Sequence, residues 1–185
     1  MPSTPPSAIP NRADTLRVLR AISGHQPVLM LTGSDDGYVY LTKDNGAHWQ
    51  NVTPTGLQEC LINAIEISPF DKATAYIATT RYKFNDHTPG LYKTTDYGKT
   101  WTRLIDEKKV TGYALCIIQD PTEPNLIFVG TEQGLWVSLD NGVSFEQWKN
   151  GYPSVSTYDM AIQEREADLV IATFGRAIWI LDDIR

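Results

Sequence analysis

The sequence has few of the residues that metal and redox chemistry require. It contains 2 cysteines and 3 histidines in 185 residues, and Cys60 and Cys116 lie in separate apolar runs without a CxxC spacing or a nearby histidine. Zinc sites use thiolate and imidazole ligands, and disulfide exchange uses paired cysteines. We therefore expect two buried free thiols, no metal site and no cofactor.

A basic surface is missing as well. Lys and Arg number 16 against 22 Asp and Glu, the formal net charge is -6, and the isoelectric point is about 5.0. Proteins that bind nucleic acids need a basic face that displaces counterions from phosphates. The longest basic run here is Lys108-Lys109, so we expect no nucleic-acid partner.

Long hydrophobic runs and targeting segments are also absent. The apolar stretches, such as residues 169–174, are far shorter than the roughly 18 residues that span a bilayer as a helix. Residues 1–14 are proline-rich and contain neither the basic nor the apolar region of a secretory signal. We expect a flexible arm over residues 1–14, no membrane interaction and no targeting signal in this chain.

The motifs of the common catalytic classes do not occur. The sequence has no GxSxG, HExxH, P-loop or GxGxxG pattern. It does have enough apolar material, with 42% hydrophobic and 10% aromatic residues, to bury a core as one domain or as an array of small units.

One short motif occurs three times. It has the pattern Ser/Thr-x-Asp-x-Gly-x-x-Trp/Phe, and its aspartates are 52 and 44 residues apart. A period of about 40 to 50 residues is typical of propellers and solenoids. The three copies are Thr42, Asp44, Gly46 and Trp49; Thr94, Asp96, Gly98 and Trp101; and Ser138, Asp140, Gly142 and Phe145.

The segments around each motif predict β-strands, because they are short, rich in β-branched and aromatic residues, and bounded by Gly, Pro, Asn or Asp. Each unit contains three strands before the motif, and the aromatic residue at the end of the motif starts the fourth. Repeated four-stranded antiparallel units are the blades of a β-propeller, whereas the coils of a parallel solenoid are shorter. We predict an all-β propeller over residues 15–185, with three full blades and an incomplete fourth, over about residues 15–52, 57–104, 110–148 and 154–185.

The motif itself could be structural or could bind a cation. In a tight turn, the aspartate can accept hydrogen bonds from backbone N–H groups, the glycine can adopt a positive φ, and the aromatic ring can pack on the neighbouring sheet. A calcium loop needs more oxygen ligands at alternate positions and a distal glutamate, which residues 43–51 do not supply. We therefore interpret the motif as structural.

The motif resembles the Asp-box, or bacterial neuraminidase repeat, of sialidases, xyloglucanases, sortilin-type receptors and a photosystem assembly factor. A closer likeness is to large secreted bacterial proteins described as repeat-containing glycosyl hydrolases, whose propellers contain phrases similar to KTTDYGKTW at 93–101 and LVIATFGRAIWILDDI at 169–184. The resemblance covers residues 15–185. It implies a propeller with Asp-boxes on the rim, away from any ligand, and an extracellular or periplasmic location.

Any ligand is expected at the opposite end, where the turns between the second and third strands of each blade meet the loops that enter the first strands. Rigid scaffolds often carry function in such loops. Residues 81–90 form the longest of these turns, which we interpret as a ten-residue loop suited to a sugar or peptide, or alternatively folded over its own blade or docked on another domain. The candidate ligand-binding residues are Arg81, Tyr82, Asp86, His87, Glu132 and Arg176, with an inter-blade salt bridge as the alternative for Arg176.

Two functions fit this arrangement. A glycoside hydrolase needs two positioned carboxylates, and Asp35, Asp36, Asp86 and Glu132 are expected at the ligand end, whereas His25 and His48 are expected in solvent at the other end. A sialidase would also need three convergent arginines and an Arg-Ile-Pro type motif, which the sequence lacks.

A non-catalytic binding or scaffold module needs only a rigid face with variable loops. We predict such a module, with a carbohydrate or protein ligand, as a fragment of a larger protein, and keep the glycoside hydrolase as the alternative. Because the fourth blade lacks its last strand, three closures are open: a tight four-bladed ring, the pairing of two chains, or completion by a longer parent. We predict a homodimer for the isolated chain.

Overall fold

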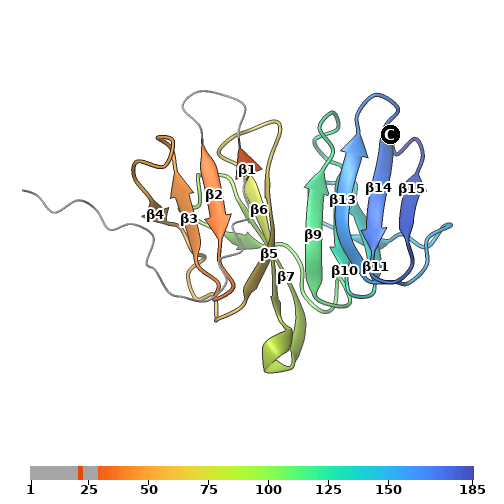
Figure 1. Ribbon diagram of the computed structural model, residues 1–185, viewed down its shortest axis with the longest axis horizontal. Helices are drawn as coiled ribbons and strands as arrows, with labels where there is room; N and C mark the ends of the chain where they lie inside the picture. The colour runs from red at the N-terminus through yellow and green to blue at the C-terminus, as the bar shows by residue number, and fades with distance from the viewer. Residues whose placement is uncertain (1–20, 23–28) are drawn as a thin grey trace, which may run out of the picture.

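The computed structural model describes residues 21–22 and 29–185, which form four antiparallel β-sheets side by side (Figure 1). Three sheets have four strands in chain order and the last has three. The predicted all-β propeller fold, with three full blades and an incomplete fourth, is confirmed. The arm predicted at residues 1–14, and His25, lie outside the described residues.

The sheets are numbered blades 1 to 4 along the chain, and a single turn of 3-10 helix, η1 (Tyr82–Phe84), interrupts blade 2. The strands are β1 (Ala21–Ile22), β2 (Met30–Gly33), β3 (Val39–Thr42) and β4 (Gln50–Asn51) in blade 1; β5 (Leu61–Ile67), β6 (Ala75–Arg81), β7 (Asp86–Thr94) and β8 (Thr102–Arg103) in blade 2; β9 (Ala114–Gln119), β10 (Ile127–Thr131), β11 (Gly134–Ser138) and β12 (Glu146–Gln147) in blade 3; and β13 (Thr157–Gln163), β14 (Asp168–Thr173) and β15 (Ile178–Leu181) in blade 4.

Neighbouring blades bury the faces that they turn toward one another. Ile127 and Val129 of β10 belong to the apolar cluster shared with blade 2, and Phe128 between them belongs to the cluster shared with blade 4. Alternate side chains of a strand point to opposite faces of its sheet. The continuous apolar run in β10 therefore reflects a blade that is covered on both sides.

The inner strands of blades 3 and 4 approach one another closely. A Cβ atom on Gly130 would lie 2.4 Å from Sγ of Cys116 and 2.8 Å from the carbonyl oxygen of Thr157, so β10 requires glycine where it passes β9 and β13. Cys116 and Cys60 are both buried and unbridged. The prediction of buried free thiols is confirmed, and burial raises the pKa of Cys60 to about 11.

The motif turns share one hydrogen-bond pattern, shown here for blade 2. The Thr94 hydroxyl accepts from the Gly98 N–H at 2.9 Å and donates to Oδ1 of Asp96 at 2.9 Å. Asp96 also accepts from the backbone N–H and the hydroxyl of Thr100, which together hold its pKa at about 2. Tyr97 and Gly98 both have positive φ, of 62° and 77°. The two successive left-handed residues reverse the chain within the turn.

The other two turns repeat this pattern, but a different residue donates to the aspartate at the position of Thr100. In blade 3 this residue is Ser144. In blade 1 it is the exposed His48, whose Nδ1 lies 2.6 Å from Oδ2 of Asp44. His48 is thus exposed as expected but is also paired. In both turns the hydroxyl and the glycine N–H keep their bond, at 2.9 Å for Thr42 and Gly46 and 2.8 Å for Ser138 and Gly142.

The aromatic residue of the motif joins its blade to the preceding one. Trp101 Nε1 donates to the carbonyl of Val52 at 2.7 Å, and its ring packs in the cluster between blades 1 and 2. Phe145 packs in the equivalent cluster between blades 2 and 3. Lys43 adds a cation–π contact across blades, 3.7 Å above the ring centroid of Tyr97. The turns therefore fasten neighbouring blades together.

The prediction of a ten-residue loop at 81–90 is wrong. Strand β6 continues to Arg81 and β7 already begins at Asp86, where the two residues pair, so the turn itself is only η1 and left-handed Asn85. In Figure 1 this yellow-green hairpin projects beyond the other turns of its end. The insertion is thus a two-stranded extension of blade 2.

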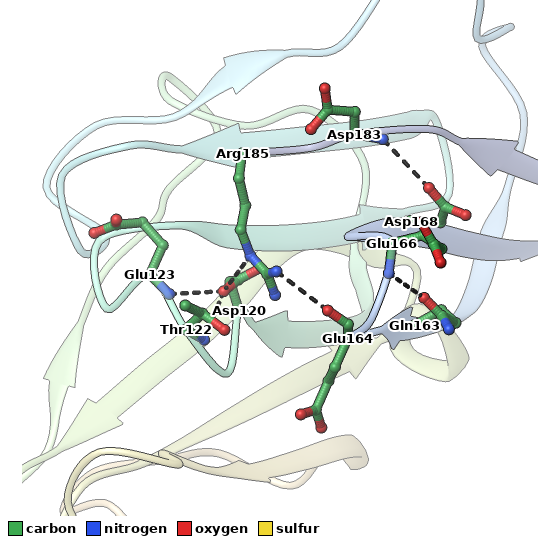
Figure 2. A network of polar contacts seen from close by, with 9 residues as sticks. All are labelled: Asp120, Thr122, Glu123, Gln163, Glu164, Glu166, Asp168, Asp183 and Arg185. Atoms are coloured by element: carbon green, nitrogen blue, oxygen red, sulfur yellow. Dashed lines mark hydrogen bonds and ion pairs between the residues drawn. The ribbon is translucent and has the colours of Figure 1, made fainter.

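The chain beyond β15 turns back toward blade 3 and does not add a fourth strand to blade 4 (Figure 2). The Ile184 N–H donates to the carbonyl of Ala167 at 2.9 Å. Arg185 Nε lies 3.0 Å from Oδ2 of Asp120, a fully buried carboxylate that also accepts from the N–H groups of Thr122 and Glu123, both at 2.7 Å. This ion pair fastens the edge of blade 4 to blade 3.

Replacing Thr94 with valine tests the hydrogen bonds of the motif turn. Thr94→Val keeps the size and shape of the side chain but leaves the buried Gly98 N–H without an acceptor, which costs about 1 to 3 kcal/mol of unfolding free energy. Urea unfolding of the variant measures the loss. Thr100→Val, on the exposed side of the same turn, is the control, and an equal loss in both variants would contradict the argument.

The outer face of blade 4 gives a second prediction. Ile178 and Ile180 are 68% and 57% exposed, whereas Trp179 and Leu181, on the other face of β15, pack against blade 3. We expect this exposed apolar face, and the edge of β15 that pairs with no strand among the described residues, to associate two chains. Light scattering after size exclusion should give twice the chain mass of 20.7 kDa.

The matched variants for this prediction are Ile178→Lys with Ile180→Lys, which should yield a monomer, and Leu139→Lys. Leu139 is 74% exposed in the motif turn of blade 3, so its replacement should leave the dimer intact. A wild-type species of 20.7 kDa at high concentration would contradict the prediction.

Candidate functional site

The turns β2–β3, β6–β7, β10–β11 and β14–β15 lie at one end of the blades, because every blade is antiparallel and runs in the same sense. We call this end, with the loops that enter β5, β9 and β13, the hairpin face; it is the lower edge of Figure 1. The motif turns lie at the other end. The hairpin face carries the predicted ligand-binding residues.

Three of the predicted residues meet around an aromatic side chain of blade 3. The rings of Tyr82 and Tyr113 are stacked, with centroids 5.9 Å apart and planes at 28°. The His87 ring lies 5.7 Å from that of Tyr113, and its Nδ1 lies 3.5 Å from Oε2 of Glu132. The Glu132 N–H donates to the Tyr113 carbonyl at 3.1 Å. We call these four residues the aromatic cluster.

Tyr113 was not among the predicted site residues, because the sequence pattern assigns it to the first strand of blade 3 and not to the loop that enters this strand. Tyr113 immediately precedes β9, in the loop between blades 2 and 3. Its neighbour in the chain, Ala114, is buried, whereas Tyr113 is partly exposed. A tyrosine at the start of a predicted inner strand was the available signal.

Arg81 and Asp86 are paired beside the turn that closes the β6–β7 hairpin. Arg81 Nε lies 3.2 Å from Oδ2 of Asp86, its Nη1 donates to Oε1 of Gln58, and its guanidinium lies 5.2 Å from the Phe84 ring centroid. The pKa of Asp86 is lowered, chiefly by hydrogen bonds from the side chain and backbone of Thr88, with Arg81 contributing. Asp86 is therefore a paired carboxylate.

Arg176 lies apart from the other predicted residues, at the tip of the β14–β15 turn. Its carbonyl accepts from Trp179 Nε1 at 2.9 Å, and its exposed side chain makes no ion pair with any carboxylate in the described ranges. Beside it, the exposed Phe174 ring lies 5.9 Å from the ring of Tyr158. Blade 4 thus presents a second aromatic pair on the hairpin face, which the sequence argument also missed.

Glu66, a carboxyl group with a raised pKa, is not on the hairpin face. Burial raises the pKa of Glu66 to about 7, against the effect of a hydrogen bond with the backbone of Gln119. Glu66 pairs with buried Tyr76 in the β5–β6 ladder, so it lies between blades 2 and 3. Asp36, one of the acids expected at the ligand end, accepts from the hydroxyl of Ser34.

No group of three or more His, Cys, Asp and Glu side chains suited to a metal occurs among the described residues. Over the same residues, no helix is long and apolar enough to cross a membrane.

No protein-family model matches the chain, and no sequence match to a curated protein is found. Among solved structures, the fold is similar to an ancestral GH74 enzyme, with a TM-score of 0.69 and 11% identity over 91% of this chain and 25% of that one. It is also similar to YCF48 bound to D1 peptide, with a TM-score of 0.63 and 14% identity over 92% and 52% of the two chains.

YCF48 from Cyanidioschyzon merolae is a third similar structure, with a TM-score of 0.62 and 16% identity over 94% of this chain and 58% of that one. The chain therefore spans about a quarter of the length of the GH74 enzyme and just over half of the YCF48 chains. At these identities, the likeness supports a propeller fold and no particular activity.

The raised pKa of Glu66 predicts a pH dependence of stability. Because the folded state holds the proton more tightly than the unfolded chain, the contribution is full below about pH 4.5 and is lost as the pH rises through about 7. Glu66→Gln removes this loss, so the variant should exceed the wild type by on the order of 1 to 3 kcal/mol at pH 8 and match it near pH 4.

Urea unfolding across this pH range measures the difference. Glu146→Gln makes the same substitution at an exposed position of β12 and is the control. A parallel pH profile for Glu66→Gln and the wild type would refute the assignment.

Proposed function

We propose that the chain is a non-catalytic binding or scaffold module built on Asp-box propeller blades, and that its ligand is a carbohydrate held on the hairpin face. The observation that carries the proposal is the aromatic cluster, in which rings from two blades lie beside a carboxylate. The three copies of the motif, with their shared hydrogen bonds, support the Asp-box assignment.

The surface chemistry of the hairpin face suits sugars. Tyr82, Tyr158 and Phe174 are 48%, 54% and 74% exposed, so their rings offer apolar faces on which sugar rings can stack. Glu132 and His87 supply hydrogen-bonding groups beside the first of these rings. Few polar groups among apolar rings are the usual composition of a small-ligand site.

The state of the carboxyl groups favours binding over hydrolysis. A glycoside hydrolase uses one carboxyl as an acid with a raised pKa and another as base or nucleophile. Asp86 has a lowered pKa and an arginine partner, and Glu132 faces His87. Glu66 has the raised pKa but lies between blades. Glycoside hydrolysis, for which the likeness to a GH74 enzyme is the support, is therefore kept as the alternative.

The lengths of the similar structures also support a functional unit that is larger than this chain. Because the chain spans about a quarter of one neighbour and about half of two others, we propose that its blades act within a larger ring, supplied by a second copy or by a longer parent protein. One of the neighbours is a propeller bound to a peptide, which makes a protein segment the second ligand class to test.

A glycan array and a glycosidase screen on the purified chain test the proposal. We expect glycan binding without turnover, weakened roughly three- to tenfold by Tyr113→Ala, because an aromatic contact contributes about 0.5 to 1.5 kcal/mol beyond burial. Replacing residues 81–90 with a four-residue turn should abolish binding and leave the fold intact.

Phe70→Ala is the control for these variants, because Phe70 is 46% exposed but lies in the β5–β6 turn, at the other end of the blades. Unchanged glycan affinity in the hairpin replacement would rule out the hairpin face as the site. Turnover of a glycoside by the wild type would favour the enzyme instead.

A further inference from the structure

A cavity of about 410 Å³ lies between blades 2 and 3, near the motif turns and away from the hairpin face. The outer strands of blade 2 form one wall and the motif turn of blade 3 forms the other. Two lysines, Lys93 and Lys109, line it together with Thr95, Thr100 and Thr102. The volume is in the range of small-molecule sites, about 300 to 1,000 Å³.

Lys93 reaches into this cavity from β7 without an acidic partner. Its Nζ donates to Oδ1 of Asn141 at 2.8 Å and lies 5.4 Å from the ring centroid of Tyr76. The side chain is partly buried, and this burial lowers its pKa. An ammonium has three donors, and a neutral amide oxygen satisfies one of them while leaving the charge uncompensated.

Lys109 approaches the same wall from the loop after β8. Its Nζ donates to the carbonyl oxygens of Leu104 and Val143, both at 3.3 Å. Asn141 and Val143 belong to one turn, so the two ammonium groups are held two residues apart along it. In the part of the chain that the structure describes, neither ammonium forms an ion pair with a carboxylate.

The other charged groups near the cavity do not neutralise the two lysines. Arg103 also contributes to the wall, but its guanidinium donates to the carbonyl of Pro89 at 2.8 Å, and strand alternation places it on the face opposite Thr102. Asp96 and Asp140, the aspartates of the two flanking turns, accept hydrogen bonds from Thr100 and Ser144 within their own turns.

From this geometry we infer that the cavity binds an oxyanion, a carboxylate or phosphate group, on a small hydroxyl-bearing molecule. In a chain with 22 acidic and 16 basic residues, two lysines that converge on a cavity without a carboxylate leave room for an anion from outside. Thr95 and Thr102, which also line the cavity, carry hydroxyls that can pair with the remainder of the ligand, whereas the Thr100 hydroxyl already donates to Asp96. The site is separate from the hairpin face and does not depend on the proposed function.

Isothermal titration of the full chain with glucuronate, glucose 6-phosphate and glucose tests the inference. We expect binding of one or both anions, weakening as salt is added, and none of glucose. The anion that binds more tightly identifies the head group.

Lys109→Gln should weaken anion binding about tenfold, the equivalent of one lost charge contact. Its side chain is exposed in the loop, so the fold should be retained, and Lys93→Gln should have at least the same effect. Lys108→Gln is the matched control, because it makes the same charge change one residue away, outside the cavity.

Three results would overturn the inference: neither anion binds, glucose binds as tightly as the anions, or Lys109→Gln and Lys108→Gln bind alike. None of the residues that line the cavity lies in 81–90, so the hairpin replacement should still bind the anion, although it removes the Pro89 carbonyl to which Arg103 donates. If the hairpin replacement loses glycan binding but still binds the anion, the hairpin face and the cavity are independent sites.

Discussion

The packing of one blade on the next is the constraint on which this structure depends. A four-stranded blade has two faces and buries neither by itself, so the cores lie between blades 1 and 2, 2 and 3, and 3 and 4. Phe128 and Val129, adjacent in β10, belong to two different cores for this reason. Ile178 and Ile180 are exposed because no neighbouring blade covers the outer face of blade 4 in this structure.

The motif turns stabilise the packing of neighbouring blades at one end of the sheets. Within each turn a hydroxyl, a carboxylate and two left-handed residues fix the chain reversal. In blades 2 and 3 the following aromatic residue then packs against the preceding blade, as Trp101 does when it donates to the carbonyl of Val52. Because one end of the blades is held in this way, the other end can vary without loss of the core. The hairpin of blade 2 uses this freedom.

The end of the molecule at which the candidate residues lie was predictable, but their grouping was not. Tyr82, His87 and Glu132 come from turns that topology places together, yet Tyr113, which joins them, belongs to a loop between blades. The sequence Thr88-Pro89-Gly90 favours a loop. In the structure Pro89 falls where the pairing of β6 and β7 is irregular, a position at which a strand tolerates a residue without an N–H group.

The sequence by itself determined the strands, the number of blades and the motif turns, because these follow from periodic burial and from hydrogen bonds between residues a few positions apart. Only the tertiary structure decided that residues 86–90 extend a strand, that Arg185 reaches the buried carboxylate of Asp120, and that Lys93 and Lys109 share one cavity. These contacts join residues from different blades or across a ladder. Their partners are chosen by packing, which no local pattern in the sequence records.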